Sequence, residues 1–197
     1  MSKNIDYSIE KPKGGKFFGA FKAHSVAAEV MESKTDRSGK QYHKIVVDFE
    51  YDNGFVSEDG ELSKKRAFFM LPYDYWKDGT NGQPLSPFRQ LCEATKKKLE
   101  DFKGDVEKTF VGLDATILVG AQRHWKTKEL NLWGENKDKI SYGIIGFAPY
   151  AKAKTAWTPE MEEVEQQAIS ELGSSGNRVA TADDLVDVST HNQADKW

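Results

Sequence analysis

Residues 122–139 interleave positively charged side chains with tryptophans, at Arg123, Trp125, Lys126, Lys128, Trp133, Lys137 and Lys139. Single-stranded nucleic acid binds to such mixtures because bases stack on aromatic rings at about 1–3 kcal/mol each, while Lys and Arg follow the phosphates and release counterions. Duplex DNA hides its base faces. The segment therefore favours single strands over duplex.

Residue types that perform catalysis do not gather at the spacing that catalysis requires. The four histidines are scattered, and no nucleophile elbow, zinc helix or phosphate-binding loop is recognisable. Asp48, Glu50 and Asp52 alternate as acids that could gather a divalent metal, but such alternation is more typical of a solvated strand face. Cys92 is the single cysteine, so it forms no internal disulfide and suggests no zinc site. We expect a binding protein that is not an enzyme, with no metal and no cofactor.

Three strands are predicted in the first half of the chain, at residues 17–32, 42–51 and 64–71. The second strand alternates most clearly, with Ile45, Val47, Phe49 and Tyr51 on one face and Lys44, Val46, Asp48 and Glu50 on the other. Polar, glycine-containing runs separate these strands, as expected for turns. The third strand begins with Lys64, Lys65 and Arg66 and ends hydrophobic.

A helix and two further strands are predicted in the second half. Ser86 and Pro87 supply an N-cap and a first-turn proline, and apolar residues recur at helical spacing from Phe88 to Phe102, with Gly104 just past the end. Strands follow at 113–121 and 140–147. Five strands with one helix between the third and fourth is the order of the OB fold, so we expect a mainly β protein with a five-stranded OB-type barrel.

An OB barrel binds oligonucleotides on the face of its second and third strands, between the loops that follow strands one and four. Here those loops are residues 34–40 and 122–139, and both carry positive charge. The candidate DNA-binding residues are therefore Lys44, Lys64, Lys65, Arg66, Arg123, Trp125, Lys126, Lys128, Trp133, Lys137 and Lys139.

Charge is divided unequally along the chain. The formal net charge is −3, but residues 157–197 hold nine acidic and two basic residues, a net charge of −7, which leaves +4 on residues 1–156. We expect an OB-type DNA-binding body at 1–156, an acidic helix at 157–173 and a disordered acidic tail at 174–197. A basic body favours a polyanionic ligand, and an acidic tail favours another partner or the body itself. No apolar stretch is long enough for a membrane span and the start does not resemble a signal peptide, so we expect a cytoplasmic protein.

The order of elements resembles that of phage-encoded OB-fold single-stranded DNA-binding proteins that work at the replication fork. The resemblance covers about three quarters of the chain, since it includes the long first strand, Arg37-Ser-Gly-Lys-Gln41 before the alternating strand, the helix after Leu71, and Val111-Gly-Leu-Asp-Ala-Thr-Ile-Leu-Val119. It implies that the protein coats exposed strands without sequence preference during phage DNA replication, recombination or repair, in the host cytoplasm.

The tail is similar to tails that recruit replication proteins such as a polymerase or a helicase in that class. Its acids are sparse and Lys196 precedes the last residue, which departs from the usual pattern. The tail residues implied in partner binding are Asp183, Asp184, Asp187, Asp195 and Trp197. A homo-oligomer is left open.

Other interpretations remain at this point. Trp125 and Trp133 could be core residues of a β-hairpin extension, since tryptophan is usually well buried. The same aromatic residues could serve a non-catalytic domain that binds protein or carbohydrate. A nuclease would require a cluster of metal-binding acids, which the sequence does not assemble.

Overall fold

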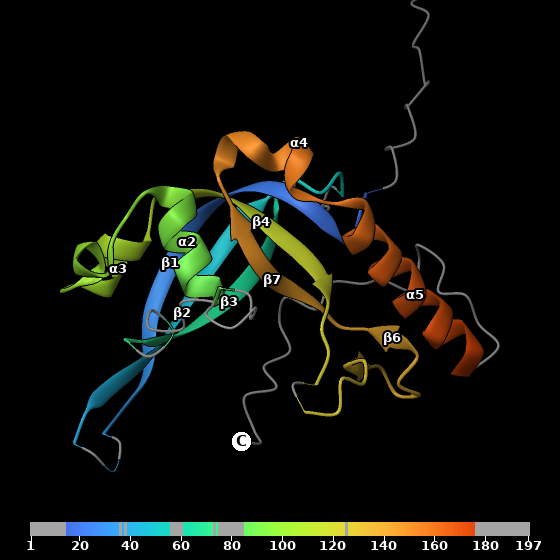
Figure 1. The fold of residues 1–197 in the computed structure, drawn as a ribbon, viewed down its shortest axis with the longest axis horizontal. Helices are drawn as coiled ribbons and strands as arrows, with labels where there is room; N and C mark the ends of the chain where they lie inside the picture. Colours follow the sequence, from blue (N-terminus) through green and yellow to red (C-terminus); the bar gives the residue numbers. More distant parts are fainter. Residues whose placement is uncertain are drawn as a thin grey trace, which may run out of the picture.

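The computed structural model describes residues 15–35, 37, 39–55, 61–72, 74, 85–124 and 126–175. Its centre is a five-stranded antiparallel sheet in the order β3-β2-β1-β4-β7, curled so that one face encloses the core (Figure 1). We call the enclosed side the inner face and the opposite side the outer face. The predicted mainly β architecture is confirmed.

The first strand organises the sheet, because it pairs on both sides. β1 (Gly19–Thr35) pairs through its first residues with β4 (Asp114–Ala121) and through the rest with β2 (Gln41–Tyr51), which in turn pairs with β3 (Ser63–Leu71). Register shifts between Ser25 and Ala27 and between Val30 and Glu32 mark two bulges in β1. Bulges bend a strand and increase its twist, which lets β1 serve both halves of the sheet.

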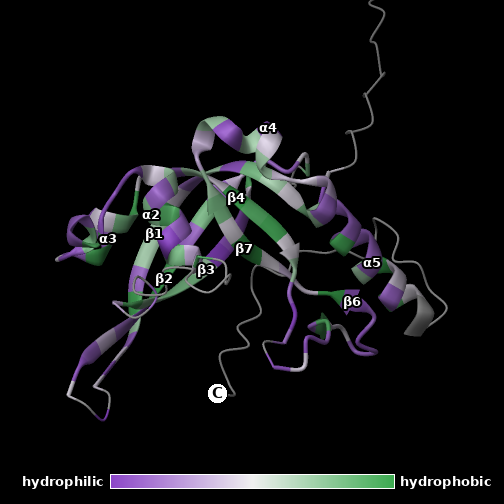
Figure 2. Ribbon diagram, in the orientation of Figure 1, coloured by the Kyte–Doolittle hydropathy of each residue, from purple (hydrophilic) through white to green (hydrophobic). Residues whose placement is uncertain are grey.

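The alternation predicted for residues 42–51 is confirmed on the inner face, where Ile45, Val47, Phe49 and Tyr51 are all buried in the core. Val46 differs from a simple pattern, since it is also buried, with 2% of its surface exposed, although it lies on the outer face. Figure 2 shows the hydrophobic residues concentrated in the sheet, whereas the β1–β2 hairpin tip and the segment around β5 and β6 are hydrophilic.

The prediction of one helix between the third and fourth strands is wrong in its extent. The helix α2 (Pro87–Thr95) begins as expected, with the Ser86 hydroxyl accepting from the Arg89 amide, but it ends where Lys96 adopts a left-handed conformation with φ of 57°. A 3₁₀ turn, η2 (Leu99–Phe102), and a second helix, α3 (Val106–Phe110), follow. The predicted apolar residues Phe88, Leu91, Cys92 and Phe102 are nevertheless buried.

These helical segments close one end of the curled sheet with aromatic rings. The Phe69 ring of β3 lies 5.4 Å from the Phe88 ring, and the Phe102 and Phe110 rings lie 4.6 Å apart. Cys92 is a buried free thiol, and burial raises its pKa to about 11. It therefore remains protonated and acts as a packing residue.

The remaining elements follow β4. They are β5 (Leu132–Trp133), β6 (Lys139–Ile140), β7 (Tyr142–Ala148), η3 (Tyr150–Lys152), α4 (Ala153–Ala156) and α5 (Pro159–Ser175). The fifth predicted strand corresponds to β7, whereas β5 and β6 form a separate two-stranded hairpin inside the predicted excursion. The acidic helix starts as predicted but passes through Gly173 to Ser175. The predicted disordered tail lies outside the described residues beyond that point.

Helix α5 packs on the body through a buried carboxylate. Both Glu165 oxygens accept from the Ala121 amide, at 2.9 and 3.0 Å, and Glu165 is only 2% exposed. A Cβ at Gly120 would lie 2.6 Å from Glu165 Oε1, so the close approach depends on that glycine. Among the described residues, no helix has the length and apolar character to cross a membrane.

Candidate nucleic-acid interface

The outer face of β2 and β3 carries three of the predicted cations. The antiparallel register places Lys44 opposite Met70, Asp48 opposite Arg66, and Glu50 opposite Lys64. Because side chains alternate across a strand, Lys44 of β2 and Lys64 and Arg66 of β3 share the outer face. The structure thus brings these three side chains together.

An exposed aromatic ring lies among them. Phe68 of β3 is 52% exposed and pairs with Val46, and the Lys44 ammonium lies 5.2 Å from the centre of its ring. A cation at this distance is attracted to the ring quadrupole. An open ring beside a cation is the arrangement that stacks a base and neutralises its phosphate.

Acidic neighbours partly neutralise this face. Arg66 donates two hydrogen bonds to the Asp48 carboxylate, at 2.8 and 3.0 Å, and Lys64 lies 3.1 Å from Glu50. Hydrogen bonds to these acids raise the pKa values of both cations. Exposed ion pairs contribute little net stability, so phosphates can replace the carboxylates at small cost. Asp48 and Glu50 thus act as ion-pair partners, whereas Asp52 accepts from the Gly54 amide. Among the described residues, no group of His, Cys, Asp and Glu side chains is placed to hold a metal ion.

Lys65 does not join this face. It pairs with Phe49, whose side chain is in the core, and it alternates with Lys64 and Arg66, so it lies on the inner side of β3 near the start of the strand. Lys64, Lys65 and Arg66 were predicted to bind DNA together, but successive side chains of a strand point to opposite faces, so Lys65 faces away from the other two.

The excursion of residues 122–139 forms a separate basic region beside α5. Arg123 donates to both carboxylate oxygens of Glu171, at 3.1 and 3.2 Å, and to the Lys128 carbonyl at 3.0 Å. The pairing with Glu171 means that one predicted DNA-binding cation already faces an acid of the C-terminal helix. Among the other predicted lysines of this segment, Lys139 is partly buried, whereas Lys126, Lys128 and Lys137 are exposed.

Trp133 belongs to the β5–β6 hairpin. Its indole N–H donates to the Ile140 carbonyl at 3.2 Å, and the Lys139 ammonium lies 4.9 Å from its ring centre. The ring is partly buried and one of its neighbours is already a cation. These contacts support the alternative in which Trp133 stabilises a hairpin extension, while its role in binding stays a prediction.

The segment that contains β6 and the β1–β2 hairpin lie on opposite sides of the view in Figure 1. In Figure 1 the β1–β2 hairpin extends to the lower left, whereas the segment containing β6 lies at the lower right beside α5. Trp125 and the tail residues lie outside the described residues: Asp183, Asp184, Asp187, Asp195 and Trp197.

Phe68 is the residue that the sequence analysis missed, and a signal for it was present. Phe68 and Phe69 are adjacent in a predicted strand, so one of them had to point away from the core. A second missed feature is a hollow beside the start of β1, lined in part by Phe18 and Trp157. Neither residue stands near a predicted binding segment in the sequence.

Comparison with known proteins gives no family for this chain. No protein-family model matches it, and no curated protein matches its sequence.

Proposed function

We propose that this chain is a single-stranded DNA-binding protein with an OB fold, which coats exposed strands without sequence preference in phage DNA replication, recombination or repair. The observation that carries the proposal is the exposed Phe68 ring with the Lys44 ammonium 5.2 Å from its centre, on the outer face of β2 and β3. That face is the one OB folds use for oligonucleotides.

The strand arrangement supports the OB assignment. β1 pairs with both β2 and β4, the sheet order is β3-β2-β1-β4-β7, and helical segments connect β3 to β4. In an OB fold the β1–β2 hairpin and the excursion after β4 would correspond to the two loops that flank the groove. Both segments carry the cations expected of such loops.

The chemistry of the face favours single strands. An aromatic ring accepts any base, since every base has a π-face, whereas paired bases are stacked on one another and cannot reach it. The chain would therefore bind as a non-catalytic coat, and the acidic tail would bind a replication protein such as a polymerase or a helicase.

Fluorescence titration with dT oligomers, mixed-sequence oligomers and duplex DNA at several salt concentrations tests this function. We expect single strands to bind far more tightly than duplex, with little sequence preference and strong weakening by salt, because binding releases counterions. Equal affinity for duplex, or no DNA binding, would contradict the proposal. Cleavage of the oligomers would indicate a nuclease instead, and binding of carbohydrate or protein alone would indicate the other β-domain function.

A further inference from the structure

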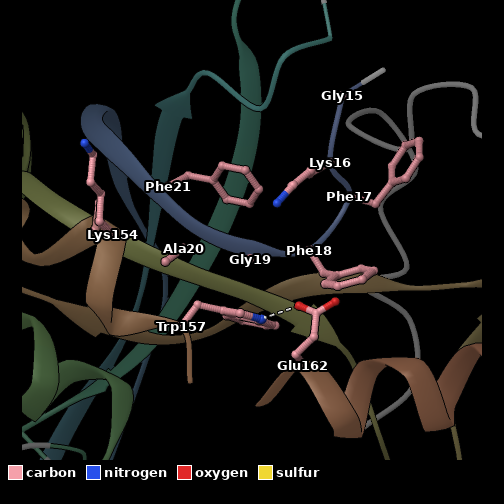
Figure 3. A pocket seen from close by; sticks show the side chains of 11 residues that line it. Gly15, Lys16, Phe17, Phe18, Gly19, Ala20, Phe21, Lys154, Trp157 and Glu162 are labelled. Atoms are coloured by element: carbon pink, nitrogen blue, oxygen red, sulfur yellow. Dashed lines mark hydrogen bonds between the residues drawn. The ribbon is translucent and has the colours of Figure 1, made fainter. Parts of the chain in front are cut away.

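A hollow of about 500 Å³ opens beside the start of β1, between the residues that precede this strand and the segment that joins α4 to α5 (Figure 3). Ligand pockets in proteins range over roughly 300–1,000 Å³, so it is large enough for a small planar group. Its lining includes Lys16, Phe18, Phe21, Lys154 and Trp157.

Aromatic rings form the apolar part of the lining. Figure 3 shows the Phe18 and Trp157 rings along one side of the hollow and Phe21 across from them. The Phe18 and Trp157 ring centres lie 6.1 Å apart with an angle of 34° between the planes. This spacing makes them neighbours on a common wall, on which one flat group can stack.

The Trp157 ring is held in place by α5. Its indole N–H donates to Glu162 Oε2 at 2.8 Å, and the other oxygen of that carboxylate accepts from Gln166 at 3.1 Å. The polar edge of the indole and the carboxylate are thus bonded to each other. What the wall offers to a ligand is ring surface.

Two cations complete the hollow. In Figure 3 the Lys16 ammonium points toward the Phe21 ring, and Lys154 lies at the other end of the hollow with its ammonium directed away from the Phe18 and Trp157 rings. Within the described part of the chain, neither ammonium group has an acidic partner. Rings with nearby positive charge suit a planar group that carries a negative charge, which is the chemistry of a nucleotide.

The hollow adjoins the excursion. The Phe18 ring is stacked with Tyr142 at a centre distance of 6.0 Å, and Tyr142 begins β7, two residues after β6 ends. The hollow is therefore continuous, through ring contacts, with the end of the predicted DNA-binding segment.

We propose that this hollow is a second contact site for single-stranded DNA, in which one base stacks on the Phe18 and Trp157 rings and its phosphate lies against Lys16. The site rests on the proposed function and adds to it a place at which the strand leaves the β2–β3 face and reaches the start of α5.

Photocrosslinking of the full chain tests the site directly. Oligo-dT carrying 5-iododeoxyuridine at successive positions is irradiated in complex with the protein, and the crosslinked peptides are identified by mass spectrometry. We expect crosslinks at Phe18 or Trp157 as well as at Phe68. Crosslinks at Phe68 without any at the hollow would overturn this site and leave the proposed function standing. No binding of the oligomer would contradict both.

A charge substitution tests the phosphate contact. The slope of log affinity against log salt concentration is negative, and Lys16→Gln should make it less steep by about 0.7, which corresponds to the loss of one phosphate contact to a single strand. The matched control is Lys103→Gln, an exposed lysine after η2. An unchanged slope for Lys16→Gln, or an equal decrease for both variants, would overturn the site. If the hollow binds a protein segment and not DNA, the slope for Lys16→Gln would likewise be unchanged, and the site would be rejected as a DNA contact.

Discussion

Phe68 and Phe69 are consecutive residues of β3 with opposite environments. Phe69 is 1% exposed and contacts the Phe88, Phe110 and Phe147 rings, whereas Phe68 is 52% exposed on the outer face. An exposed phenylalanine gives up the roughly 1.5–3 kcal/mol that burial of such a side chain contributes. The open ring beside Lys44 is the surface on which the proposed base stacking depends, so its removal tests that proposal.

We predict that Phe68→Ala weakens binding of a dT oligomer by about 1–3 kcal/mol, because one base loses its stacking surface. The free energy of unfolding should change by no more than about 0.5 kcal/mol, as for other surface substitutions. Fluorescence anisotropy and urea unfolding measure the two quantities.

Tyr150→Ala is the matched control for Phe68→Ala. Tyr150 is also an exposed aromatic residue beside a cation, since the Lys22 ammonium lies 4.7 Å from its ring centre, but it belongs to η3. Equal losses of affinity in both variants would show that the β2–β3 face has no particular role.

The outer-face position of one phenylalanine could be predicted, since strand alternation alone separates Phe68 from Phe69. The ion pairs of that face could not. Arg66 meets Asp48 only because β2 and β3 pair in one register, and a hydrophobic pattern defines which face is buried without defining which residues stand opposite.

The bulge at Ser25 joins β1 to the turn before β4. The buried Ser25 hydroxyl donates to the Phe110 carbonyl at 2.6 Å and accepts from the Leu113 amide at 2.7 Å, while the backbone of Ser25 also bonds to Gly112 and Leu113. One side chain thus links the end of α3 to the first strand.

We predict that Ser25→Ala lowers the free energy of unfolding by about 1–3 kcal/mol, since it leaves a buried amide and carbonyl without this partner. Urea unfolding provides the measurement. Ser33→Ala on the same strand removes an exposed hydrogen bond to His43 and should cost no more than about 0.5 kcal/mol. A Ser25 variant as stable as the Ser33 variant would refute the linking role.

Helix α5 carries an acid in an unfavourable place. Burial raises the pKa of Glu165 above its ordinary value of 4.5; the Ala121 amide and the charge of Arg123 oppose the shift, and Glu162 adds to it. The same burial affects the neighbouring Tyr142, whose pKa is raised to about 12 by burial and by the charge of Glu165. Because the folded state binds the Glu165 proton more tightly, this residue's contribution to stability is present below pH 4.5 and is lost as pH rises through the folded pKa.

We predict that Glu165→Gln becomes more stable relative to the wild-type chain as pH rises from about 4 to 7, since an amide has no charge to bury and its oxygen still accepts from the Ala121 amide. Urea unfolding of both chains across this range gives the difference, in which the other carboxylates cancel. Glu163→Gln, an exposed position on the same helix, is the control. A difference that is constant with pH would show that Glu165 titrates as it does in the unfolded chain.

Local signals predicted the helices in part. Ser86 and Pro87 specify the start of α2, and Asp105, whose side chain accepts from the Glu107 and Lys108 amides, is the N-cap of α3. The left-handed conformation of Lys96 has no such signal, because lysine rarely adopts it, although the Lys96 and Lys97 amides donate to carbonyls in the last turn of α2. Likewise, Gly173 was expected to end α5 but lies inside it.

For the molecule as a whole, a mainly β architecture could be predicted from the order of the elements along the chain, but the distribution of charge in space could not. The excursion and the β2–β3 face were expected to form one groove, and in Figure 1 the excursion lies beside α5 while the β1–β2 hairpin extends to the other side of the view. The Arg123–Glu171 pair joins the basic excursion to the acidic helix, a contact that depends on where α5 packs.

We predict that removing residues 176–197 tightens binding of single-stranded DNA, most strongly at low salt. The deletion starts after α5 so that the helix stays intact, and it removes four acidic and two basic side chains, a net charge of −2. If the tail competes with DNA for basic surfaces, its loss frees them, and screening by salt reduces the gain. Anisotropy at two salt concentrations measures the effect, and a pull-down with replication proteins tests the partner.

If the truncated and full-length chains bind DNA with equal affinity at each salt concentration and capture the same partners, the tail is a solubilising segment. A full-length chain with Asn at the four acidic tail positions separates charge from length, since it keeps the tail and removes its negative side chains.

The β1–β2 hairpin also offers a means of engineering reach. From Glu32 to Thr35 the strand is exposed and pairs with residues 41–44, so this part forms an arm that contributes nothing to the core. The arm can be shortened by deleting the facing pairs Lys34 with Tyr42 and Thr35 with Gln41 together, which preserves the alternation of every remaining side chain. The Ser33–His43 hydrogen bond, at 2.7 Å, would then close the new end. The length of the arm can thus be changed while the sequence of the sheet stays fixed, which would vary how far the arm extends from the sheet.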